Sequence, residues 1–256
     1  MAGAARKTKV SEITEQINVM GRHLRDGGSL DAMTWRRLFN QLEALDNADQ
    51  FGLALLLQAV LWSFKDQPDQ AARLFNIYAG RLGKDQEWYF TRANMAPMFG
   101  DVSPVIEMLG AVYPSGDVHR LSKVAVMCNH AGMFMSAQKA IEDIDKLDRV
   151  RGESVRSECG FLGDVVAYLK NHSVPEVDVA KRILAASRVV LDQGFVLTKY
   201  AVRANEYGIT FEFVLDADIE RLVDVNMAIS DTLATNFEDT LCQHLSVGVT
   251  PKEEAA

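Results

Sequence analysis

The fold is decided by residues 53–78, LALLLQAVLWSFKDQPDQAARLFNIY. An apolar run stops at the polar turn of residues 66–69, and apolar residues then recur at helical spacing, which predicts two antiparallel helices. Six positions of this segment are apolar again 34 residues later, and once more after a further 32 residues. A period in the low thirties is typical of stacked helical hairpins. The three sets are Leu55, Ala59, Trp62, Ala71, Phe75 and Tyr78; Tyr89, Ala93, Ala96, Val105, Leu109 and Val112; and Leu121, Ala125, Cys128, Ala137, Ile141 and Ile144.

This pattern resembles the tetratricopeptide repeat, a helix–turn–helix unit, over about residues 50–148. The likeness rests on a small-then-large pair in each second helix and on an alanine in each first helix, namely Ala59, Ala93 and Ala125. The glycine and the closing proline of the family's pattern are absent. The resemblance implies a concave groove, lined by the first helix of each unit, that takes a segment of a partner protein.

The resemblance also implies which residues would face the groove. Because the polar members are amides and a hydroxyl, the groove would suit a helix or an extended segment rather than a charged chain end. The alternative is that the array is short and packs this face against its own C-terminal module. The groove positions are Leu56, Val60, Phe90, Asn94, Ser122, Val126 and Asn129.

The chain continues as a helix and then changes character. Apolar spacing predicts one further helix over residues 155–169, and another from Pro175 to Gly194. Residues 195–204 and 209–215 predict an antiparallel β-hairpin, because the second of these segments alternates apolar and polar residues. A helix beginning after residues 216–218 and a third strand over residues 241–249 complete the pattern.

The predicted fold is therefore mainly α, an array of antiparallel helical hairpins followed by a small α+β module that contains an antiparallel hairpin. The array is expected at residues 11–174 and the module at residues 175–250. Flexible tails are expected at residues 1–10 and 251–256, since neither end carries an apolar pattern.

Composition is typical of a soluble globular protein, with 48% hydrophobic and 24% charged residues. No apolar run reaches the length of a bilayer span, and no apolar core follows the basic residues of the N-terminus. The three cysteines are too few and too scattered for a disulfide framework. These features predict a cytoplasmic protein that does not enter a membrane.

Negative charge is concentrated in the second part of the chain. Residues 1–150 hold 17 basic and 18 acidic side chains, whereas residues 151–256 hold 10 basic and 17 acidic ones. This balance argues against nucleic-acid binding and favours a basic partner, although solubility alone explains it equally simply. Asp216, Asp218, Glu220 and Asp224 form an acidic run at a helix start. Helix capping and the helix dipole explain Asp216 to Glu220, and the alternative is an acidic patch that contacts a basic protein.

The sequence contains no glycine-rich phosphate loop, zinc-protease motif or nucleophile elbow. Cys128 and His130 point to different faces of a predicted helix. Cys242 and His244 would share a face of a predicted strand, but two ligands do not make a zinc site. We therefore expect no catalytic residue, no metal site and no cofactor.

The expected function is a non-enzymatic adaptor or chaperone-like protein that binds a partner through the helical-repeat groove. The expected contact residues are those of the groove, together with Asp218, Glu220 and Asp224. One alternative is an acidic inhibitor, like an immunity protein, that masks a basic partner such as a nuclease toxin. The other alternative is an enzyme whose site is not recognisable from one sequence. A homo-oligomer is compatible with each of these functions.

Overall fold

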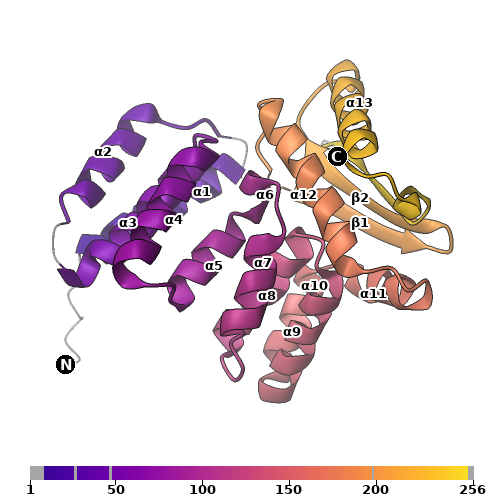
Figure 1. Cartoon of the computed structure of the whole chain (residues 1–256), viewed down its shortest axis with the longest axis horizontal. Coiled ribbons are helices and arrows are strands. Elements are labelled where there is room, and N and C mark those ends of the chain that lie inside the picture. The colour runs from indigo at the N-terminus through magenta and orange to yellow at the C-terminus, as the bar shows by residue number, and fades with distance from the viewer. Residues whose placement is uncertain (1–8, 26–27, 46–47, 198, 253–256) are drawn as a thin grey trace. The chain divides into compact units, whose positions relative to one another are not determined.

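The computed structural model describes residues 9–25, 28–45, 48–197 and 199–252. Most of the predicted tails, residues 1–8 and 253–256, therefore lies outside the described residues. The remainder belongs mainly to regular structure, because Lys9 begins a helix and Pro251 ends a strand. The chain is mainly helical with a small sheet near its C-terminus, as predicted (Figure 1). It forms two compact units, Met1–Met95 and Ala96–Ala256, so the boundary expected at residue 175 falls inside unit 2.

Unit 1 is helical in its described residues, and its first three helices share one apolar core. Its elements are α1 (Lys9–Arg25), α2 (Ala32–Glu43), α3 (Ala48–Ser63), α4 (Pro68–Leu82) and α5 (Gln86–Asn94). Helices α3 and α4 pack as the predicted first hairpin, and α1 and α2 pack against α3. The core of α1, α2 and α3 buries Val10, Ile13, Ile17, Met20, Leu24, Trp35, Leu38, Leu42, Leu45, Ala54, Leu57 and Leu61.

Aspartates cap two of these helices, α2 and α5. Asp31 accepts hydrogen bonds from the backbone N–H groups of Met33 and Thr34 and so caps α2. Asp85 caps α5 through the N–H of Trp88, and its second carboxylate oxygen accepts from the Tyr78 hydroxyl at 2.7 Å. These aspartates therefore satisfy backbone N–H groups at the starts of the two helices.

Unit 2 begins with helices and ends with a sheet. Its helices are α6 (Ala96–Phe99), α7 (Ser103–Val112), α8 (Val118–His130), α9 (Phe134–Leu147), α10 (Arg149–Glu158), α11 (Leu162–Asn171), α12 (Glu176–Asp192) and α13 (Ile219–Asn236). Helices α8 and α9 pack as the predicted third hairpin. The predicted second hairpin has its first helix, α5, in unit 1 and its second helix, α7, in unit 2.

One helix boundary differs from the prediction. The single helix expected over residues 155–169 is two helices, α10 and α11, which are separated at Gly160. Gly160 has a φ of +60°, a left-handed conformation that an α-helix cannot contain. The spacing of apolar residues did not reveal this break, because Val155 before it and Leu162 after it are both apolar and buried.

The sheet contains β1 (Lys199–Asn205), β2 (Gly208–Leu215) and β3 (Leu245–Pro251), in the order β1-β2-β3. β1 and β2 form the predicted antiparallel hairpin, in which Val202 lies opposite Phe211. β3 runs parallel to β2, and such a pair needs a crossover, which α13 supplies. Leu241, expected in the third strand, lies instead in a 3₁₀ helix, η1 (Thr240–Gln243).

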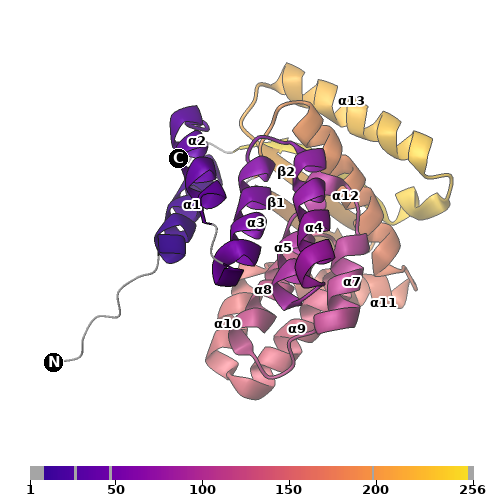
Figure 2. The same ribbon diagram turned by 60° about the vertical axis from the view of Figure 1, so that its left-hand side comes forward.

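One face of the sheet is covered by helices. Ile209, Phe211, Phe213 and Leu215 alternate along β2 as buried residues. Helix α11 contacts β1 and β2, whereas α12 and α13 contact β3. Figures 1 and 2 both show α13 beside α12 at the periphery of unit 2, which leaves one side of α13 facing solvent.

Candidate functional site

The residues expected to line the repeat groove lie in three helices, two in unit 1 and one in unit 2. Leu56, which is buried, and Val60, which is half-buried, are in α3 of unit 1. Phe90 and Asn94 are in α5 of unit 1, where Phe90 is half-buried and Asn94 is exposed. Ser122, Val126 and Asn129 are in α8 of unit 2, where Val126 is half-buried. The exposed fraction is only 4% for Ser122 and 2% for Asn129. Ser122 and Asn129 are therefore too deeply buried in this structure to contact a partner protein.

The burial of these two residues has a definite cause. The Asn129 side-chain amide donates a 2.8 Å hydrogen bond to the Tyr200 hydroxyl on β1. The Ser122 hydroxyl donates to the carbonyl of Val118 and accepts from Nε of Arg151 in α10. Asn129 of α8 thus contacts the predicted C-terminal module, as in the alternative that the sequence left open, whereas Ser122 contacts α10 of the predicted array.

The expected acidic residues all lie at the start of α13. Asp218 is the N-cap, and its carboxylate accepts a 2.8 Å hydrogen bond from the backbone N–H of Arg221. Glu220 and Asp224 are exposed on the first turns of the helix. Asp218 therefore has a structural role, whereas the carboxylates of Glu220 and Asp224 face solvent.

Three exposed apolar residues lie near these carboxylates on α13. The sequence pattern alone does not distinguish them from the buried residues of the same helix. Ile219 is 76% exposed, Val223 is 50% exposed and Met227 is 61% exposed. They occur at intervals of four residues, which places them along one side of an α-helix. The four-residue spacing could have identified this exposed stripe from the sequence. It was obscured because the buried residues Leu222, Val225 and Ile229 recur at helical spacing in the same segment.

Apolar and acidic residues form two neighbouring stripes on the exposed side of α13. Because successive residues of an α-helix are turned by about 100°, Ile219, Val223 and Met227 fall within a sector of about 80°. The exposed carboxylates of Glu220, Asp224 and Asp231 fall within the next sector, of about 60°. We call these six residues the α13 surface.

Helix α13 is held firmly on its other side. Leu222, Val225 and Ile229 are buried within unit 2. The Asn226 side chain accepts from the backbone N–H of Val249 at 2.9 Å and donates to the carbonyl of the same residue at 3.3 Å. This pair of bonds satisfies both backbone groups of Val249 and so ties α13 to the edge strand β3.

The chain leaving α13 is anchored by a buried arginine. Arg182 of α12 donates to Asp239 at 2.5 Å and to the carbonyl of Asp178 at 2.9 Å. Its guanidinium carbon lies 4.3 Å from the ring centre of Phe237. The backbone N–H of Leu241 and the guanidinium of Arg182 lower the pKa of the Asp239 carboxyl. The α13 surface is thus presented by a helix fixed along its length and at its exit.

The three cysteines are free thiols in the described part of the chain. Burial raises the pKa of Cys159 to about 11, and it also raises the pKa of the buried Cys128 thiol. Cys242 lies in η1 and not on a strand with His244, whose Nδ1 is 2.9 Å from the Tyr168 hydroxyl. Among the described residues, no group of three or more histidine, cysteine or acidic side chains could hold a metal ion.

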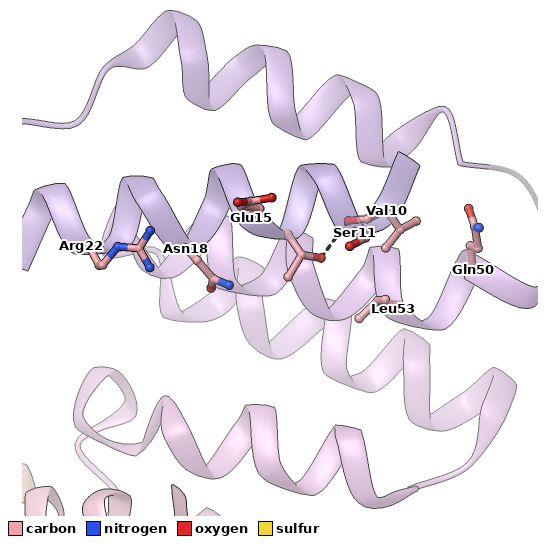
Figure 3. A pocket seen from close by; sticks show the side chains of 8 residues that line it. Val10, Ser11, Glu15, Asn18, Arg22, Gln50 and Leu53 are labelled. Carbon is pink, nitrogen blue, oxygen red and sulfur yellow. Dashed lines mark hydrogen bonds between the residues drawn. The ribbon is translucent and has the colours of Figure 1, made fainter. Parts of the chain in front are cut away.

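Unit 1 carries a shallow groove of about 580 Å³ between α1 and the start of α3 (Figure 3). Glu15, Asn18 and Arg22 line it from α1, and Gln50 and Leu53 line it from α3. The lining combines both signs of charge with amides and one exposed leucine, and it converges on no buried polar group. It therefore specifies a ligand less well than the α13 surface does.

Comparison of the chain with protein-family models, with curated proteins and with solved structures gave no match. None of the helices in the described ranges is long and apolar enough to cross a membrane.

Proposed function

We propose that this protein binds another protein without catalysing a reaction, and that the α13 surface holds a basic amphipathic helix of that partner. The observation that carries the proposal is the exposure of Ile219, Val223 and Met227 beside a row of carboxylates. Large apolar side chains gathered on one exposed helix face are typical of interaction sites. A resemblance to the tetratricopeptide repeat supports the same class of function.

The charge pattern favours a basic partner over a second copy of this chain. Glu220, Asp224 and Asp231 lie on one flank of the apolar stripe, where lysines or arginines of a partner helix would meet them. If two α13 helices packed antiparallel about a twofold axis, their two acidic stripes would lie on the same side of the helix pair. Like charges would then oppose each other, which disfavours this self-association.

The partner would dock mainly through its apolar face. An amphipathic helix presents side chains at spacings of three and four, and these pack between the side chains of Ile219, Val223 and Met227. The carboxylates would add orientation and speed of association more than affinity, because exposed ion pairs contribute little to stability. Both an adaptor and an inhibitor that masks a basic protein would use such contacts.

The proposal is tested with a synthetic helical peptide that carries leucines on one face and lysines on the other, and calorimetry measures its affinity. Val223→Asp should weaken binding roughly tenfold or more, because it puts a charge in the centre of the contact. Val150→Ser is the matched control, since Val150 is an exposed valine of α10 in the same unit. Equal loss of affinity in both variants, or no loss in either, would contradict the proposal.

A second set of variants tests the acidic stripe. Glu220→Lys combined with Asp224→Lys should slow association at low salt, and wild-type association should slow as salt screens charges beyond about 8 Å at physiological ionic strength. Asp218 is left unchanged because it caps α13. Glu206→Lys, on the exposed β1–β2 turn, is the charge control. Association that is insensitive to salt in the wild-type protein would argue against a basic partner.

A further inference from the structure

Three aromatic side chains of unit 1 meet at one end of α3. Trp35 and Phe39 of α2 are stacked with their ring centres 5.0 Å apart. Trp62 of α3 meets Trp35 edge-on at 4.9 Å and Phe39 at 5.5 Å. The Trp35 indole N–H donates to the carbonyl of Leu61 at 2.6 Å, which fixes the orientation of this ring. We call Trp35 and Trp62, backed by Phe39, the aromatic corner.

The aromatic corner already contains a cation. Lys65 places its ammonium nitrogen 3.6 Å from the ring centre of Trp35 and 5.8 Å from that of Trp62. Both distances lie within the range of a cation–π interaction. A positive charge is therefore stabilised by two indole rings whose planes are inclined by 64°.

The backbone turn after α3 presents Lys65 to these rings. The N–H of Gln67 donates to the carbonyl of Trp62 at 3.2 Å, and the N–H of Asp66 donates to the carbonyl of Ser63 at 3.1 Å. These two bonds are those of a Schellman cap, in which Asp66 takes the left-handed position with a φ of +50°. The backbone of Lys65 is thus fixed next to Trp62, while its side chain is exposed and can leave.

The partners of this ammonium are rings. Within the described part of the chain, the structure records no carboxylate paired with Lys65. Trp35 is only 5% exposed, and the lysine side chain lies over its face. A primary ammonium ion is strongly hydrated, whereas a quaternary ammonium has no N–H donors and loses less when it leaves water for an aromatic face. The corner is therefore better suited to a quaternary ammonium than to the lysine that fills it.

We propose that the aromatic corner is a binding site for a quaternary ammonium group, and that Lys65 is an internal competitor that occupies the site when no ligand is present. Binding requires only that the Lys65 side chain rotates into solvent. No bond is formed or broken. The α13 surface belongs to unit 2, so this proposal is independent of the proposed function.

Trp88 provides a matched contrast in the same unit. Lys84 lies 5.0 Å and Arg92 lies 5.2 Å from the centre of this ring. Within the described residues, the structure records Lys84 over the Trp88 ring alone, whereas Lys65 approaches two rings. Removing Lys84 should therefore leave quaternary ammonium binding unchanged.

Titration with tetramethylammonium chloride tests the proposal, with the indole N–H signals of Trp35 and Trp62 followed by NMR spectroscopy. Ammonium chloride at the same concentration controls for ionic strength. The wild-type protein should bind tetramethylammonium weakly, and Lys65→Ala should lower the apparent Kd about tenfold. If Lys65 fills most of the sites, removing it raises the fraction of protein molecules with an open site by about that factor. Lys84→Ala should bind as the wild-type protein does, and Lys65→Gln repeats the test if Lys65→Ala is poorly folded.

The source of the ammonium group is distinguished by two further probes, choline and N-acetyl-trimethyllysine amide. Tighter binding of choline would assign the site to a small molecule, and tighter binding of the lysine derivative would assign it to a methylated protein; either result supports the proposal. The proposal is overturned if the indole signals respond equally to ammonium and tetramethylammonium chloride. It is also overturned if Lys65→Ala and Lys65→Gln, both folded, bind no more tightly than the wild-type protein.

Discussion

Helices α8 and α13 of unit 2 have similar apolar patterns and opposite surroundings. The polar residues of α8 that the sequence assigned to an open groove, Ser122 and Asn129, are buried against α10 and β1. Three apolar residues of α13, Ile219, Val223 and Met227, face solvent, although their helical spacing in the sequence does not distinguish them from the buried residues of this helix. The comparison shows that polarity alone does not identify the exposed side of a helix. The packed side of α8 buries polar residues together with their hydrogen-bond partners, and a peripheral helix such as α13 can keep apolar residues exposed to solvent.

The largest expected effect separates the two sides of α13 itself. Ile229→Ala removes a fully buried side chain and should lower the free energy of unfolding by about 2–5 kcal/mol, because it leaves a cavity. Met227→Ala, on the exposed stripe two residues away, should change it by less than about 0.5 kcal/mol. Urea unfolding of both variants measures the difference. Comparable losses in the two variants would mean that the stripe is packed against the protein.

A smaller effect is expected in α8. Asn129→Ala leaves the Tyr200 hydroxyl without its partner inside unit 2 and should lower the free energy of unfolding by about 1–3 kcal/mol. Asn94→Ala is the control, because Asn94 of α5 is exposed, and it should be neutral within about 0.5 kcal/mol. If Asn129→Ala were as neutral as Asn94→Ala, the side of α8 that carries Asn129 would be open and the predicted groove would return as a candidate.

The smallest effect concerns the segment that leaves α13. Because the pKa of Asp239 is lowered in the folded state, its ionised carboxylate stabilises the protein at pH values above the unfolded pKa of about 3.8. This contribution is lost as the pH falls through the lower, folded value. Asp239→Asn should therefore be less stable than the wild-type protein at pH 7, with a difference that shrinks below pH 4. Urea unfolding at both pH values checks this, and a constant difference would show that the charge of Asp239 has no role.

The sequence predicted the elements well because their signals are local. Repeated small residues such as Ala59, Ala125 and Ala137 are all fully buried, as expected for helices that pack closely. The alternating residues of β2 and its hairpin with β1 were also confirmed. The parallel pairing of β2 with β3 was not predicted, because no local pattern records which strand a crossover returns to.

The candidate surface could be predicted only in part. The acidic residues were visible as charges, and the capping role that the sequence offered for Asp218 was confirmed. Burial of Asn129 depends on Tyr200, which lies 71 residues further along the chain, and one sequence does not reveal such a partner. Similarly, Val223 and Met227 differ from the buried Leu222 and Val225 only by their direction around α13, which is set by the position of the sheet.

The most direct test of the account is an amide NMR titration of the isotope-labelled protein with the helical peptide of leucines and lysines. We expect chemical-shift changes that centre on Ile219, Val223 and Met227, with smaller changes at the neighbouring carboxylate residues. Signals of Ser122 and Asn129 should not move, because these residues are buried within unit 2. Changes centred on α8, with α13 unaffected, would contradict the account and restore the repeat groove as the binding site.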